Sequence, residues 1–135
     1  EIAINFIAQN TVNFYLGYNL YVNGELVQNA KLTTATQIAD YAFFGCKSLT
    51  TIELPETLTK IGVSAFSYCV LLKTVKMPES LTSIGAYAFE NCLSLVNITI
   101  PNNVTTIEAY AFQDCSSLKN VTIGNSVTTI NRSTF

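Results

Sequence analysis

Hydrophobic and polar positions recur along this chain with a fixed step of 23 residues. The four cysteines, Cys46, Cys69, Cys92 and Cys115, are each 23 residues apart. Three apolar columns keep the same step: Phe43, Phe66, Phe89, Phe112 and Phe135; Ile38, Ile61, Ile84, Ile107 and Ile130; and Leu49, Leu72, Leu95 and Leu118. Self-similarity at a fixed period is typical of repeat proteins. The sequence therefore predicts a solenoid whose coils stack and pool their apolar columns into one core.

Each repeat divides into three segments. Ile52 and Leu54 alternate with polar residues before a proline, which favours a short first strand that ends there. Leu58 and Ile61 enclose two polar residues, which indicates a second short strand or a turn. The segment 64–69, SAFSYC, spaces its apolar residues by one and four positions, as a short helical turn with one buried side would. The predicted fold class is an α/β repeat solenoid of strand, second strand or turn, and short helical turn.

The N-terminal part does not keep this pattern. Around Asn23 and Gly24, a tight-turn pair, lie the apolar-rich runs 20–22 and 25–27, a strong signal for a β-hairpin. We therefore predict an irregular unit over residues 1–31 and repeats over residues 32–135, with the last repeat truncated. The segment 31–37 aligns with 54–60 only if about one residue is missing. Because the chain starts without methionine and stops inside a repeat, we expect it to be part of a longer protein.

Two repeats carry a resemblance to a known family. The segments 48–69, SLTTIELPETLTKIGVSAFSYC, and 94–115, SLVNITIPNNVTTIEAYAFQDC, resemble BspA-like, or Treponema-type, leucine-rich repeats. The segment NLYVNGELV is similar to an insertion between such repeats. The resemblance implies a right-handed solenoid with a parallel sheet on its concave side. It also implies a secreted or surface protein of a host-associated bacterium or a protozoan, several members being adhesins for host matrix proteins or other microbes.

The composition argues against several partner classes. Only 12% of the 135 residues are charged and the net charge is −2, so no basic field is available for nucleic acid. No run of 18 apolar residues occurs, so membrane insertion is not expected. Polarity comes instead from threonine, serine and asparagine. We expect neither a nucleic-acid partner nor a membrane span.

Catalytic and metal chemistry have little support in the sequence. The chain has no histidine, the commonest general base, and its nine acidic residues are scattered by the repeat. The cysteines occupy one point of successive coils with parallel side chains, which favours buried free thiols over disulfides or a zinc site. Glu56 and Glu79, equivalent in adjacent coils, could clasp calcium, but two solvated turn residues are the favoured interpretation. We predict no catalytic residue, cofactor or metal.

The outward positions of the first strands are the better candidate site. Solenoids bind along their extended sheets, and alternation places one set of polar residues outward. Glu53 is expected beside Lys76 as a cross-strand pair. The alternative is that these residues only keep the surface soluble. The predicted partner-binding residues are Thr51, Glu53, Thr74, Lys76, Asn97, Thr99, Asn120 and Thr122.

A second group of exposed residues is aromatic. Tyr41, Tyr87 and Tyr110 share one column, with Phe44 and Tyr68 nearby. Such a row could anchor a partner or cover the rim of the core, and the second interpretation is favoured.

These patterns predict a non-catalytic protein-interaction or adhesion module of a secreted or cell-surface protein, with a host or microbial protein as partner. The alternatives are a structural spacer and a targeting region of a cell-wall enzyme. An open last repeat leaves a strand edge and apolar columns unpaired, so we also expect weak self-association of this chain.

Overall fold

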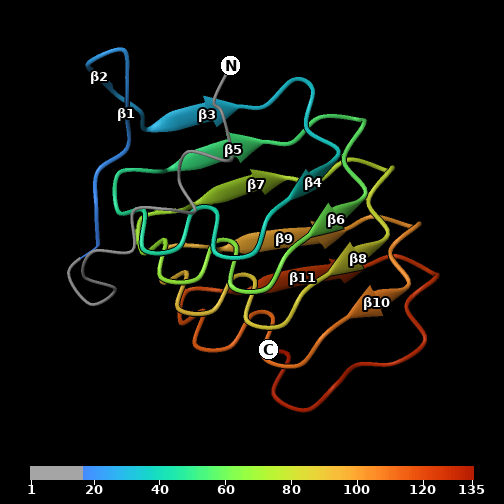
Figure 1. Ribbon diagram of the computed structural model, residues 1–135. Coiled ribbons are helices and arrows are strands. Elements are labelled where there is room, and N and C mark those ends of the chain that lie inside the picture. The colour runs from blue at the N-terminus through green and yellow to red at the C-terminus, as the bar shows by residue number, and fades with distance from the viewer. Residues whose placement is uncertain (1–16) are drawn as a thin grey trace.

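The chain folds into a solenoid of stacked coils (Figure 1). The computed structural model describes residues 17–135. Each full coil contributes one first strand and one second strand. The first strands are β3 (Asn29–Lys31), β5 (Thr51–Glu53), β7 (Thr74–Lys76), β9 (Asn97–Ile100) and β11 (Asn120–Ile123). The second strands are β4 (Gln37–Ile38), β6 (Lys60–Ile61), β8 (Ser83–Ile84) and β10 (Thr106–Ile107).

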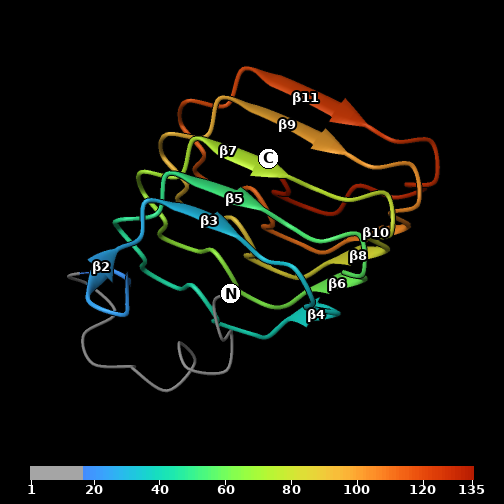
Figure 2. The ribbon, with the colours of Figure 1, turned by 90° about the horizontal axis from the view of Figure 1, so that it is seen from above.

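Like strands of successive coils pair in parallel. The first strands form a β3-β5-β7 ladder and a β9-β11 ladder, and β7 and β9 lie side by side where the two meet (Figures 1 and 2). The second strands form one ladder in the order β4-β6-β8-β10. Asn97 faces Asn120, and all partners in the β9-β11 and β5-β7 pairs are 23 residues apart. We call the first set the first-strand sheet.

The N-terminal unit joins this stack directly. A short antiparallel hairpin pairs β1 (Tyr21–Val22) with β2 (Glu25–Leu26). Asn23 and Gly24 form its turn with φ of 50° and 81°, the left-handed conformation that these residue types tolerate. The next strand, β3, already pairs with β5 in the first-strand sheet. The boundary predicted at residue 31 stays a prediction.

The short helical turns expected after each second strand are wrong, because residues 17–135 contain no helix. Successive N–H groups of this segment alternate between two acceptors. Ala42 N donates to Ala39 O within its own coil, whereas Phe43 N donates to Ala65 O of the next coil. Left-handed residues such as Tyr41, with φ of 60°, break the regular helical path. Tight turns thus give the same spacing of buried residues. We call these connections the turn row.

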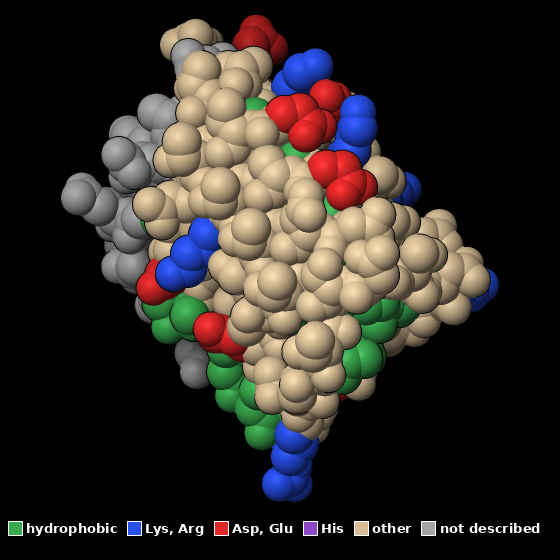
Figure 3. All heavy atoms as spheres, turned by 90° about the vertical axis from the view of Figure 1, so that its right-hand side faces the viewer, with side chains coloured by type: hydrophobic (Ala, Val, Ile, Leu, Met, Phe, Trp, Pro, Cys, Tyr) green, Lys and Arg blue, Asp and Glu red, His purple; other side chains and the backbone are tan. Residues whose placement is uncertain are grey.

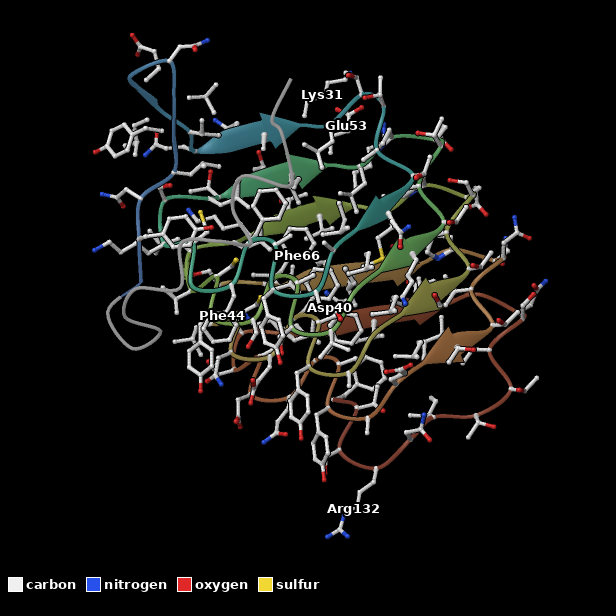
Figure 4. All side chains as sticks on the ribbon, viewed as in Figure 1. Lys31, Asp40, Phe44, Glu53, Phe66 and Arg132 are labelled. Atoms are coloured by element: carbon white, nitrogen blue, oxygen red, sulfur yellow. The ribbon has the colours of Figure 1, made fainter. Side chains whose placement is uncertain are left out.

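The core is built from vertical stacks of identical side chains. Phe66 lies inside the solenoid (Figure 4) and stacks on Phe43 and Phe89, with ring centroids 5.1 Å apart in both pairs. Phe112 and Phe135 continue the stack. Leucine and isoleucine columns are also buried beneath both sheets. Because one coil cannot bury these side chains alone, each coil depends on its neighbours for its apolar contacts.

Candidate binding surface on the first-strand sheet

Alternation along the first strands separates a buried face from an exposed face. Ile52, Val75 and Ile98 point inward and are buried. The eight residues predicted to bind a partner lie on the opposite side. Thr51 and Glu53 are half-buried, and the other six, Thr74, Lys76, Asn97, Thr99, Asn120 and Thr122, are exposed. We call the exposed side of this sheet the outer face.

One row of the outer face carries only uncharged polar groups. Asn29, Thr51 and Thr74 are register partners in the β3-β5-β7 ladder, and Asn97 and Asn120 continue the row as partners in the β9-β11 ladder. The Thr51 hydroxyl donates to Asn29 Oδ1 over 2.7 Å, and Asn120 Nδ2 donates to Asn97 Oδ1 over 2.7 Å. These contacts orient the side chains before any partner arrives, which lowers the entropy lost on binding.

The second row begins with charges and ends with hydroxyls. Glu53 Oε1 lies 3.3 Å from Lys31 Nζ and 3.8 Å from Lys76 Nζ. The predicted pair of Glu53 and Lys76 is therefore present, and Lys31 approaches Glu53 more closely (Figure 4). Thr99 and Thr122 continue the row as a register pair. Because the charged side chains are largely exposed, their ion pairs contribute little to stability.

Two residues of this face were missed at the level of sequence. Asn29 and Lys31 belong to β3 and pair with Thr51 and Glu53, an offset of 22 rather than 23. The step of 23 is restored where Gln37 faces Lys60. Aligning NAKL of residues 29–32 with TIEL of residues 51–54 is the signal that would have found them, since both alternate polar and apolar positions.

A charged hollow lies where the first strands end. Its volume is about 240 Å³, and its lining includes Lys31, Glu53, Lys76, Pro55 and Pro78. Figure 3 shows acidic and basic side chains interleaved near the upper right of the molecule, while the middle of that view is mostly uncharged. The hollow therefore offers donors and acceptors of both signs at one end of the outer face.

The cysteines form a second, internal ladder. All four are free thiols, as predicted, and Cys46, Cys69 and Cys92 are buried. Three Sγ atoms donate to a phenylalanine carbonyl of the preceding coil, as Cys69 does to Phe43 O over 3.1 Å. Burial raises the pKa of every cysteine thiol, and that of the half-buried Cys115 thiol rises to about 11. Neutral thiols are poor nucleophiles and metal ligands.

The site's chemistry is that of hydrogen bonding and ion pairing. Within residues 17–135, no three His, Cys, Asp or Glu side chains are grouped as metal ligands. Glu79 instead uses its backbone and carboxylate oxygens to accept from Asn103 Nδ2 and Asn102 N. The same part of the chain holds no helix that is long and apolar enough to cross a membrane.

Comparison with known proteins identifies the repeat. The model of the BspA type leucine-rich repeat region matches residues 16–135 in six copies. The chain belongs to the BspA-type leucine-rich repeat family. The matched model describes a repeat region rather than a catalytic domain, and a leucine-rich solenoid with parallel sheets is the fold found here. No protein with a curated description matches the chain.

Solved structures of bacterial leucine-rich repeat proteins are similar to this BspA-type chain. The leucine-rich repeat protein of T. pallidum is 32% identical with a TM-score of 0.69, over 73% of this chain and 50% of that one. The pneumococcal vaccine antigen PcpA is 32% identical with a TM-score of 0.65, over 71% and 24%. A leucine-rich repeat protein of Bacteroides capillosus is 28% identical with a TM-score of 0.63, over 73% and 78%. The chain thus spans half of the first protein and a quarter of the second.

Proposed function

We propose that this chain is a non-catalytic protein-interaction module of a secreted or cell-surface protein, and that it binds a host matrix or microbial surface protein through the outer face. The outer face would be the concave side of a right-handed solenoid. The observation that carries the proposal is the pre-ordered row of amides and hydroxyls, in which Asn97 and Asn120 bond to each other while staying exposed. Family membership and the vaccine antigen among the similar structures support it.

The arrangement suits protein recognition better than small-molecule binding. The outer face is an extended sheet with a hollow lined in part by Lys31, Glu53 and Lys76, whereas small ligands favour enclosed apolar pockets. Its hydroxyl and amide groups can donate and accept at regular spacing along the strands. Lys31, Glu53 and Lys76 at one end would fix the orientation of a partner and speed the encounter.

A binding panel with matched variants tests this function. The immobilised chain would be exposed to purified host matrix proteins and to surface proteins of co-resident microbes. The double variant Asn97→Ala with Asn120→Ala removes the amide pair, and Ser83→Ala with Thr106→Ala makes comparable changes on the second strands. We expect the first variant to weaken binding at least about tenfold, the equivalent of about 1.4 kcal/mol, and the second to leave it unchanged.

Two outcomes would contradict the proposed binding function or its location. If the folded chain captures no protein from either panel, the interaction function is wrong and a spacer role replaces it. If both double variants bind like the unmodified chain, the partner site lies elsewhere on the solenoid.

A further inference from the structure

Aromatic side chains line the surface of the turn row. They form two contact groups, one in which Phe44 lies 6.0 Å from Tyr41 and 5.6 Å from Tyr68 between ring centroids, and one in which Tyr87 stacks on Tyr110 at 4.9 Å. Tyr41 and Tyr68 are 47% and 41% exposed, so their rings are only partly used in packing. We call these five residues the tyrosine stripe. Figure 4 shows Phe44 on the turn side of the solenoid, away from Lys31 and Glu53.

The backbone of the stripe is strained. All four tyrosines of the stripe have a positive φ, between 57° and 64°.

 The individual values are 60° at Tyr41 and Tyr68, 57° at Tyr87 and 64° at Tyr110. Bulky side chains are disfavoured in this left-handed region, and such backbone strain concentrates at functional sites.

The fold itself does not require aromatic residues at these positions. The equivalent turn positions of other coils have the same positive φ but carry smaller residues: Ser64 and Ser133 in the column of Tyr41, and Gly45, Asn91 and Asp114 in the column of Tyr68. Asparagine, aspartate and glycine adopt the left-handed conformation at lower cost. Aromatic rings kept at strained positions that smaller residues also occupy need a reason beyond chain geometry.

Three carboxylates belong to the same turns as these rings or directly precede them. Glu90 connects the two aromatic groups through its backbone, since Tyr68 N donates to Glu90 O and Glu90 N donates to Tyr87 O. Asp40 precedes Tyr41, and its Oδ1 is held by Val63 N over 2.8 Å. Asp114 is exposed in the column of Tyr68. In the described part of the chain, none of these three carboxylates lies within 4.0 Å of a lysine or arginine nitrogen.

The tight turns that carry the stripe, residues 41–46, 64–69, 87–92 and 110–115, contain no lysine or arginine. The basic residues of the connections lie outside these turns: Lys47, Lys73 and Lys119, the last two directly before β7 and β11, and Arg132 in the last coil. Figure 4 shows Arg132 at the lower end of the molecule, beyond the turns that carry the stripe. Rings with a negative π-face, together with carboxylates that have no ion-pair partner in the described part of the chain, attract cations.

We propose that the tyrosine stripe is a second binding surface, which takes a lysine- or arginine-bearing segment of a partner protein. Its cationic groups lie over the exposed faces of Tyr41 and Tyr68 and pair with Asp40, Glu90 and Asp114. This surface lies on the turn side of the solenoid, whereas the outer face belongs to the first-strand sheet, so the two can be occupied independently (Figures 1 and 4).

The test uses the full chain and a fluorescent, acetylated peptide of alternating arginine and glycine. The variant Tyr41→Asn with Tyr68→Asn removes two exposed rings and inserts a residue that suits positive φ. Tyr21→Asn removes a 55% exposed tyrosine of the hairpin as a control. We expect the double variant to bind at least about tenfold more weakly, the control to bind normally, and added salt to weaken binding.

A charge variant keeps the test decisive if the aromatic variant folds poorly. Asp40→Asn with Glu90→Gln removes two charges while retaining the acceptor oxygens toward Val63 N and Ser67 Oγ, and it should also weaken binding. Equal affinity in these variants and the control overturns the proposal. Binding of neutral oligosaccharides without binding of the arginine peptide would also overturn it. An aromatic variant that melts at a lower temperature but keeps its affinity would do the same, because that is the result expected for a stripe that only covers the core.

Discussion

At the scale of single residues, stability depends on side chains that repeat in register. Phe89 has a stacked ring on each side, whereas Phe135 ends the stack and is 47% exposed. Phe89→Ala should lower the free energy of unfolding by about 3–5 kcal/mol, since it leaves a cavity in the core. Phe135→Ala should cost much less. Urea unfolding compares the two, and equal losses would contradict the view that two-sided stacking stabilises the coil.

The cysteine ladder predicts how thiol reactivity depends on folding. Burial and the hydrogen bonds to carbonyl oxygens keep the thiols neutral and covered. An aromatic disulfide reagent at neutral pH should react slowly with the native chain and should detect four thiols after unfolding. Cys115, the half-buried one, should react first. Unfolded chain that shows no reactive thiol would mean that the cysteines are paired as disulfides.

Cys115 also predicts a pH dependence of stability. Its folded pKa of about 11 lies above the ordinary value of 9.0, so the folded chain holds the proton more tightly. The unfolding free energy contributed by this group is then fully present below pH 9.0 and is lost as the pH rises from there toward 11. Cys115→Ala should reduce this loss in urea titrations across that range. An identical decline in the variant would assign the effect to other groups.

At the scale of elements, the coils approach each other closely after the second strands. Gly85 N donates to Ile61 O, and a Cβ on Gly85 would lie 2.8 Å from Gly62 C and Val63 N. Gly85→Ala should therefore force a backbone shift and cost about 1–3 kcal/mol. Ser83→Ala, on the neighbouring strand, is the control with little expected effect. Matching thermal midpoints for both variants would show that the coils can separate freely.

The sequence predicted the strands better than the turns. Alternation and a following proline marked β5 and β7, because a short strand needs just one buried face and a stop. The turn segments space their buried residues as a helix would, and only the residues with left-handed backbone conformation distinguish the turns from a helix. Gly45, Asn91 and Asp114 in one column were the available signal. The outer face followed from the same alternation, and its two residues on β3, Asn29 and Lys31, were missed because one residue is missing between β3 and β4.

At the scale of the whole molecule, the last coil leaves apolar surface uncovered. A hollow of about 600 Å³ is lined in part by Leu93, Phe112, Leu118, Val121 and Phe135. In earlier coils the next coil covers the equivalent surface, and an open strand edge with apolar neighbours favours association. We expect this chain to self-associate weakly with rising concentration, as measured by light scattering, and Val121→Lys to reduce it. A strict monomer at millimolar concentration would contradict this expectation.

The central claim is that the outer face binds a protein. The most direct measurement is the NMR spectrum of the side-chain amides and backbone of the isotope-labelled chain, recorded with and without a matrix or microbial protein captured in the binding panel. We predict shifts that are concentrated at Thr74, Asn97 and Asn120 and along β5 to β11. Shifts confined to the turn row, or an unchanged outer face in a saturated complex, would contradict it.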